Sequence, residues 1–201
     1  MSSLPPKRIQ LVRHAKLVSD TAGKFIGHTD LQACASSSQQ LAEVLQTKAF
    51  DAVVSSPLQR CQILAEQVAK SNKLQVEYLQ ALQERNWGAW DGLNSADIKP
   101  SDLQAYYDDP FNYVMPQAES WDHMRARLNQ AWWSLLNHPA QDILCVTHGG
   151  VLRLLMQQIL GLEDQALFQL KLDYGVQILL EVTPTQTQPF VQLVEIRPGK
   201  L

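Results

Sequence analysis

The stretch Ile143-Leu144-Cys145-Val146-Thr147-His148-Gly149-Gly150 decides the fold class of this chain. Its first five residues are almost continuously apolar, which is typical of a strand covered on both faces of a parallel sheet. The histidine and the two glycines lead into a second apolar segment, Val151–Leu160, which has the length of a helix. A buried strand that runs into a helix in this way indicates an α/β protein, whose ligands bind beyond the carboxyl ends of the strands.

Two further apolar segments end in polar residues. Arg8–Arg13 is a short strand followed directly by His14, and Ala52–Val54 runs into Ser55-Ser56-Pro57. A serine followed by a proline is a helix start, so we expect a helix from about Leu58 to Lys70, with Ser56 as its N-cap and Pro57 at the first helical position.

The remaining segments complete an alternating pattern of strands and helices. We expect helices over Ser36–Gln46 and Ser120–Asn137, a short strand at Val76–Tyr78, and two tail strands over Gln177–Val182 and Val191–Ile196. Residues 83–118 are expected to be irregular, and segments of that length in compact domains are usually functional. The pattern predicts one domain over residues 1–201, a three-layer α/β/α sandwich with a mostly parallel sheet and an antiparallel edge. A cap or substrate segment is inserted at about 93–118.

The composition of the 201 residues excludes several function classes. The formal net charge is −3, which does not fit a basic nucleic-acid binder or a polybasic membrane anchor. No apolar run approaches the roughly 18 residues of a membrane span, and Met1–Arg8 lacks the apolar core of a signal peptide. Cys34, Cys61 and Cys145 are expected to be reduced thiols in a cytoplasmic protein. A homodimer is left open.

Five residues can converge on one cationic centre. His14 and His148 follow two strands, Arg13 precedes His14, Arg60 lies near the start of a helix, and Glu84 lies in the irregular segment. Two arginines beside two histidines favour an oxyanion, and a guanidinium binds two phosphate oxygens at once. Backbone N–H groups of the helix that starts at Gly149-Gly150 would add to this. The rival interpretation is a zinc site of the histidines and a carboxylate, but the guanidiniums would repel a cation, so no metal or other cofactor is expected.

Five sequence motifs, in order along residues 8 to 160, resemble those of the histidine phosphatase superfamily, in its phosphoglycerate-mutase-like branch. They are Leu11–Ala15, Val54–Cys61, Leu82–Gly92, Ala118–Ser120 with Arg127, and Val146–Arg153. The resemblance implies the phosphoglycerate-mutase-like fold. It also implies that His14 is the nucleophile and forms a phosphohistidine, that Arg13, Arg60 and His148 hold the phosphoryl oxygens, and that Glu84 is the proton donor and later the base.

Physical chemistry supports these implied roles. A neutral imidazole is a good nucleophile near pH 7, and fixed cations stabilise the charge of phosphoryl transfer. Glu84 needs to hold a proton, and we expect the apolar rings of Trp87 and Trp90 beside it to favour that form. Glu43, Glu66 and Glu77 are the other glutamates considered for this role, and Glu119 and Arg153 are expected to brace the site.

The chain departs from the family pattern on the substrate side. Ala15 and Lys16 replace the usual glycine and glutamate after the nucleophile, and the loop from Lys16 to Ser38 lacks other usual residues. This loop and the motif after Glu84 supply the expected substrate-side residues, which are Lys16, Gly27, His28 and Trp87.

The reaction expected is metal-independent hydrolysis of a phosphomonoester on a small phosphorylated metabolite. A mutase must keep water from the phosphohistidine, and this chain has only a modest cap segment. Length, Gly27-His28 and the tail after Leu160 resemble the α-ribazole-5'-phosphate phosphatases of cobalamin biosynthesis. Aromatic and acidic residues of the cap segment also suit a nucleoside-like group better than a second anion, although they could equally serve to pack the cap.

Three alternatives stay open. A phosphoglycerate-type mutase would isomerise its substrate faster than it releases phosphate. A phosphohistidine protein phosphatase would need an open site. A non-catalytic phosphate-binding module would bind phosphate without turnover.

Overall fold

A computed structural model describes residues 6–185 and 188–199 of the chain. Part of the N-terminal segment, including Pro5, and residues 186–187 of the turn between the tail strands lie outside these ranges. In the described part, no helix is both long enough and apolar enough to cross a membrane.

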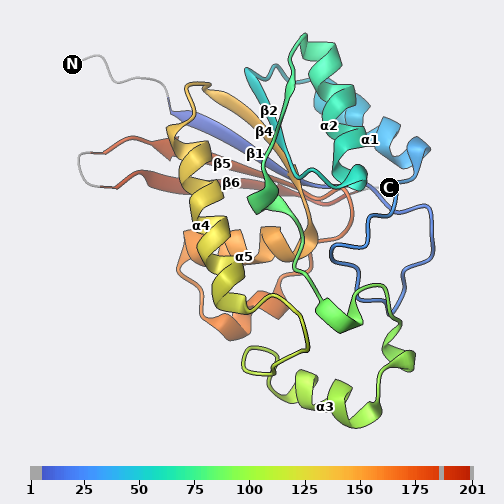
Figure 1. Cartoon of the computed structure of the whole chain (residues 1–201). Coiled ribbons are helices and arrows are strands. Elements are labelled where there is room, and N and C mark those ends of the chain that lie inside the picture. The colour runs from blue at the N-terminus through green and yellow to red at the C-terminus, as the bar shows by residue number, and fades with distance from the viewer. Residues whose placement is uncertain (1–5, 186–187, 200–201) are drawn as a thin grey trace.

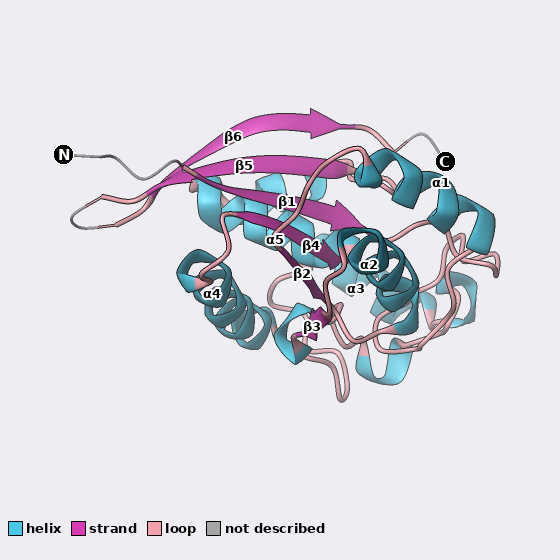
Figure 2. Ribbon diagram, turned by 90° about the horizontal axis from the view of Figure 1, so that it is seen from above, coloured by secondary structure: helices cyan, strands magenta, loops and turns pink. Residues whose placement is uncertain are grey.

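One six-stranded sheet runs through the molecule in the order β3-β2-β4-β1-β5-β6 (Figure 2). The strands are β1 (Lys7–Arg13), β2 (Ala52–Ser55), β3 (Val76–Tyr78), β4 (Asp142–Thr147), β5 (Gln177–Thr183) and β6 (Phe190–Arg197). The first four are parallel to one another, and β5 and β6 add an antiparallel edge next to β1. The mostly parallel sheet and its antiparallel edge are therefore confirmed.

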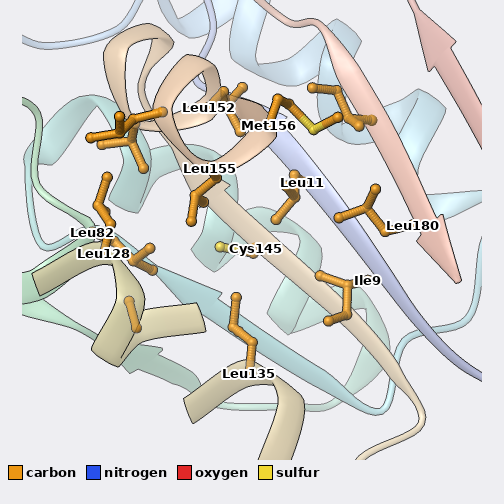
Figure 3. Packing of buried hydrophobic residues seen from close by; sticks show 14 of the residues in the cluster. Ile9, Leu11, Leu82, Leu128, Leu135, Cys145, Leu152, Leu155, Met156 and Leu180 are labelled. Carbon is orange, nitrogen blue, oxygen red and sulfur yellow. The ribbon is translucent and has the colours of Figure 1, made fainter. Parts of the chain in front are cut away.

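Helices cover both faces of the sheet (Figure 1). The helices α1 (Ala35–Gln46) and α2 (Gln59–Asn72) lie on one face, and α4 (Trp121–Asn137) and α5 (Gly149–Leu160) lie on the other. Alternate residues of β4 serve the two cores: Leu144 and Val146 join the cluster under α1 and α2, while Ile143 and Cys145 join the cluster under α4 and α5. This explains why β4 is apolar throughout. Figure 3 shows the second cluster around Cys145 and Leu128.

The start of α2 differs from the expectation. The helix begins at Gln59, its N-cap residue is Leu58, and no side chain caps it. Ser56 and Pro57 therefore precede the helix, and the prediction that Ser56 is the cap was wrong. The physical reason is that the helix starts too late for Ser56 to cap it: the Ser56 hydroxyl accepts from the N–H of Leu58 at 3.4 Å, ahead of the first turn, and lies 2.7 Å from His148 Nε2.

Residues 83–118 contain more structure than expected. Besides short 3-10 turns, they include the helix α3 (Pro100–Asp108), which has proline in its first turn. The helix buries only one residue, Tyr106, and so lacks the apolar periodicity that would reveal it in the sequence. Tyr106 packs with Trp90, Ile98 and Met115 in a small cluster of its own, which we call the cap cluster. Figure 1 shows α3 at the bottom of the molecule, apart from the sheet.

Candidate active site

The carboxyl ends of β1 and β4 bring the two expected histidines together. The strands are parallel neighbours with Arg13 opposite Thr147, and the His14 N–H donates to the Thr147 carbonyl at 3.0 Å. The imidazole rings of His14 and His148 meet edge to face, with their centroids 5.3 Å apart. Register between two adjacent strands therefore fixes the pair.

His14 is held with one ring nitrogen free. Its side chain is buried, and Nδ1 lies 2.8 Å from the Ala15 carbonyl oxygen. A carbonyl can only accept, so we assign the proton to Nδ1, which leaves the lone pair on Nε2. Burial, followed by the charges of Arg13 and Arg60, holds the pKa of His14 well below its ordinary value. The ring is thus neutral near pH 7 and can act as a nucleophile.

Arg60 lies in the first turn of α2 and is the most buried arginine of the site, at 1% exposure. Its Nε donates to His148 Nδ1 at 3.1 Å, and its two Nη atoms donate to the carbonyls of Thr29 (3.0 Å) and Gly27 (2.6 Å). Each Nη keeps a second hydrogen, which leaves the guanidinium able to hold an anion.

Hydrogen bonds fix both ring nitrogens of His148: Arg60 donates to one, and the Ser56 hydroxyl accepts from the other. Because Nδ1 accepts from Arg60, Nε2 carries the proton and donates to Ser56 Oγ at 2.7 Å. Burial, followed by the charge of Arg60, lowers the pKa of His148 well below its ordinary value. His148 is therefore a neutral hydrogen-bond donor.

Arg13 crosses from the strand end to the tail segment before β5. Its Nη1 donates to the Leu172 carbonyl at 2.7 Å, and its guanidinium carbon lies 4.0 Å from the centroid of the Tyr174 ring. Nε of Arg13 is buried and has no hydrogen-bond partner among the described residues. Such an unsatisfied donor next to His14 calls for a ligand atom.

Glu84 lies at the N-terminus of α5. Its Oε2 accepts from the Gly150 N–H at 2.9 Å, and its Oε1 accepts from the Arg85 N–H at 3.0 Å. A Cβ on Gly150 would lie 2.4 Å from Oε1, so only glycine permits this approach. The Gly150 N–H, which we expected to face a phosphate, is thus used by the carboxylate, and that expectation was wrong for this residue.

A cavity of about 290 Å³ opens beside Arg13 and Glu84, whereas His14, Arg60 and His148 are not among the residues that line it. Its lining residues are Arg13, Thr21, Lys24, Phe25, Ile26, Glu84, Arg85, Trp87, Trp121, Met124, Gly150, Arg153 and Tyr174. Trp87 lines it together with Glu84, as expected. Trp90 does not, because it is buried in the cap cluster.

The structure separates the other substrate-side candidates. Gly27 is positioned at the site, because its carbonyl holds Arg60 and a Cβ there would lie 2.1 Å from the Arg85 oxygen. Lys16 is exposed and its carbonyl accepts from the Cys34 N–H, and His28 is exposed and donates its N–H to Asp91. Neither side chain lines the cavity. Their loop turns both side chains outward in this arrangement, and a contact of Lys16 or His28 with substrate stays a prediction.

Lys24, Arg85 and Tyr174 line the cavity but were not predicted from the sequence. Arg153 also lines it, although the sequence analysis expected it only to brace the site. The available signal for Arg85 was its position directly after Glu84. Glu119 does brace the site, because it pairs with Arg127, whose Nη1 donates to the carbonyls of Ala81 and Gln83 just before Glu84.

Metal-type ligands do not gather at the site. Across residues 6–185 and 188–199, no three side chains of His, Cys, Asp or Glu lie together as a metal site would require. Cations surround the histidines instead, so the arrangement suits an oxyanion.

Comparisons with known proteins agree with this chemistry. The family model for the "Histidine phosphatase superfamily (branch 1)" matches residues 9–194. The adenosylcobalamin/alpha-ribazole phosphatase of Escherichia coli (strain K12) is 28% identical over 176 residues, which cover 84% of this chain and 86% of that protein. The 2,3-bisphosphoglycerate-dependent phosphoglycerate mutase of Bartonella tribocorum is 27% identical over 150 residues, covering 69% and 71%.

Comparison with solved structures also leads to a protein described as an alpha-ribazole-5'-P phosphatase. The crystal structure of a putative alpha-ribazole-5'-P phosphatase from Escherichia coli superposes with a TM-score of 0.82 at 24% identity, over 97% of this chain and 98% of that one. This likeness confirms the expected phosphoglycerate-mutase-like α/β fold.

Proposed function

The chain belongs to branch 1 of the histidine phosphatase superfamily and is a phosphatase, and from this premise we propose that it hydrolyses small phosphomonoesters through a phosphohistidine at His14. The observation that carries the proposal is the free Nε2 lone pair of a neutral, buried imidazole with Arg13 and Arg60 beside it. Covalent catalysis of this kind divides one difficult displacement into two easier ones.

In the first step, His14 Nε2 attacks the phosphorus in line with the ester oxygen. The P–N bond forms, the P–O ester bond breaks, and the leaving oxygen takes a proton from the Glu84 carboxyl group. Arg13 and Arg60 stabilise the charge on the equatorial oxygens. The Nε2–H of His148, which donates to Ser56, turns to one of the same oxygens.

In the second step, water attacks the phosphohistidine. Glu84, now a carboxylate, takes a proton from the water as the new P–O bond forms and the P–N bond breaks. Inorganic phosphate leaves, the lone pair returns to His14 Nε2, and Glu84 is protonated again. The hydrogen bonds from Arg85 and Gly150 keep the carboxylate in place through both steps. No step requires a metal ion.

The test is phosphate release by the purified full chain in the presence of EDTA. The panel contains α-ribazole-5'-phosphate, which similarity to the Escherichia coli phosphatase suggests, together with 3-phosphoglycerate, sugar phosphates and nucleotides. We expect release by the wild type, none by His14→Ala, and an acid-labile phosphoryl label on the wild type after rapid quenching. Undiminished release by a folded His14→Ala variant would exclude the mechanism.

A phosphoglycerate-type mutase is the second candidate, because one relative bears that name. The same assay separates the two, since a mutase would convert 3-phosphoglycerate to its isomer faster than it releases phosphate. Phosphate binding with no turnover of any substrate would instead favour a non-catalytic module.

All three cysteines are free thiols, which supports the proposal of a cytoplasmic location.

A further inference from the structure

The cavity beside Arg13 and Glu84 carries more positive charge than one phosphoryl group needs. Arg13, Lys24, Arg85 and Arg153 line it, and Glu84 is the single carboxylate among the lining residues. A phosphomonoester carries about −1.5 to −2 charge near pH 7. The two guanidinium groups of Arg13 and the buried Arg60 already balance that charge. Three cations therefore remain for some other part of a ligand.

Arg85 is the least expected of these cations, because it is only 3% exposed. Its guanidinium carbon lies 4.8 Å from the ring centroid of Trp87 and 4.2 Å from that of Trp121, so the group is in cation–π contact with both indoles. Nε donates to the Glu119 carbonyl at 3.1 Å. Nη1 is buried without a partner, and within the described part of the chain Nη2 has no hydrogen bond either.

Among the described residues no carboxylate forms an ion pair with Arg85, although the charges of Glu119 and Glu84 partly offset its own. Glu119 accepts from Arg85 through its backbone carbonyl, while its carboxylate forms a two-point pair with Arg127 (Nε to Oε1 at 2.5 Å, Nη2 to Oε2 at 2.7 Å). Burial accordingly lowers the pKa of Arg85 below its ordinary value. A buried charged donor in this state is costly unless something binds it.

Arg153 adds a second unmatched guanidinium from α5. Its Nε donates to the Leu170 carbonyl at 2.8 Å, and its charge is close enough to contribute to lowering the pKa of Arg13, after burial. Lys24 is exposed, and among the described residues its only recorded hydrogen bond is from its backbone N–H, so its ammonium group is open to solvent and to a ligand. Like charges that surround one cavity are relieved by an anion.

We propose that Arg85, Arg153 and Lys24 form a second anion subsite, which binds a carboxylate or second phosphate of the substrate while its ester phosphate lies at His14. This rests on the proposed function of the site. It reverses the expectation from the cap segment: the acidic residues Asp102, Asp108 and Asp109 do not line the cavity, and Tyr106 and Tyr113 pack the cap cluster. The physical alternative is that Arg85 serves only to pack against the two tryptophans.

The experiment compares substrates that differ by one anionic group. Glycerol 3-phosphate has a hydroxymethyl group where 3-phosphoglycerate has its carboxylate, and 2,3-bisphosphoglycerate adds a second phosphate. We expect the wild type to prefer both anionic substrates over glycerol 3-phosphate by about tenfold or more in kcat/KM, the effect of one charge-assisted hydrogen bond. The larger of the two preferences identifies the anion as carboxylate or phosphate.

Variants locate the preference in the subsite. Arg85→Gln and Arg153→Gln should each reduce the preference about tenfold, mainly through KM, while glycerol 3-phosphate is hydrolysed nearly as before. Arg197→Gln on the exposed strand β6 is the matched control and should leave the ratio unchanged. If Arg85→Gln does not fold, the subsite is still tested by the substrate preference of the wild type and by the change of that preference in Arg153→Gln.

The outcomes separate this subsite from the phosphatase itself. Equal kcat/KM for all three substrates, or a preference that survives in both variants, overturns the subsite and leaves the phosphatase standing. A lower melting temperature of Arg85→Gln with an unchanged substrate ratio assigns Arg85 to packing alone. No phosphate release by the wild type from any substrate would instead be a failure of the proposed function.

Discussion

At the scale of single residues, the state of His148 depends on Ser56. The hydroxyl accepts the Nε2–H of His148, and Arg60 donates to the other ring nitrogen. For Ser56→Ala we expect a roughly tenfold lower kcat/KM, because the His148 ring loses the hydrogen bond that holds its Nε2–H in place, and a loss of about 1–3 kcal/mol in the free energy of unfolding, because a buried donor loses its partner. Steady-state kinetics and urea unfolding measure the two effects.

A serine elsewhere gives the control. Ser71 also donates a side-chain hydrogen bond, to the Val68 carbonyl at 2.8 Å, but it lies at the far end of α2. Ser71→Ala should lower stability slightly and leave kcat/KM as in the wild type. If Ser56→Ala retained full activity, the hydrogen bond to His148 would have no catalytic role.

At the scale of elements, Asp91 fastens the loop 27–29 to the start of the cap segment. Its carboxylate accepts from the N–H groups of Gly27 (3.3 Å), His28 (2.7 Å) and Thr29 (2.9 Å) and from the Thr29 hydroxyl. The carbonyls of Gly27 and Thr29 in turn hold Arg60 of α2. Asp91 is therefore a positioning residue that acts on the phosphate site through the loop.

Asp91→Ala should release this loop. We expect kcat/KM to fall about 100-fold, since small displacements of a binding group cost that much, and hydrogen exchange to become faster at residues 27–29. Asp91→Asn keeps one acceptor oxygen, so its kcat/KM and its exchange rates at residues 27–29 should lie between those of the wild type and of Asp91→Ala. Asp122→Ala removes an exposed carboxylate of α4 and should change neither quantity. Normal exchange at the loop in an inactive Asp91→Ala would contradict the positioning role.

At the scale of the whole molecule, two neutral histidines buried at the sheet edge make stability depend on pH. Burial is the main reason that the pKa values of His14 and His148 lie well below the ordinary value, and nearby arginines add to it. The unfolded chain therefore binds more protons than the folded one as soon as the pH falls below about 6.5. Stability is full above that pH and decreases below it, until the folded histidines also titrate.

Urea unfolding between about pH 7.5 and about pH 5.5 measures this dependence. Each histidine should contribute a loss of up to about 1.4 kcal/mol per pH unit below about pH 6.5. In His14→Gln the free energy of unfolding should change less steeply with pH than in the wild type. His138 pairs with Glu77 at the surface, and His138→Gln should not make the dependence less steep. A wild type equally stable at both pH values would mean that the two histidines are not kept neutral by the fold.

The sequence by itself determined the sheet core and the strand-end residues of the site. An apolar β4 and the sequence Arg13-His14 after β1 are local patterns, and the carboxyl ends of parallel neighbours must share one edge. His14, His148, Arg13 and Arg60 could be placed together for that reason. Glu84 was distinguished from other glutamates by the motif it belongs to, not by any physical property visible in the sequence.

Only the tertiary structure decided which groups face the ligand from the loops. Ser56 partners His148 instead of capping α2, Glu84 takes the Gly150 N–H from 66 positions away, and Lys16 and His28 turn outward. Arg85 lines the cavity next to the rings of Trp87 and Trp121, which come from separate segments. Strand and helix periodicity records which face of an element is buried, whereas the path of a loop depends on contacts between distant residues, and no local pattern encodes those.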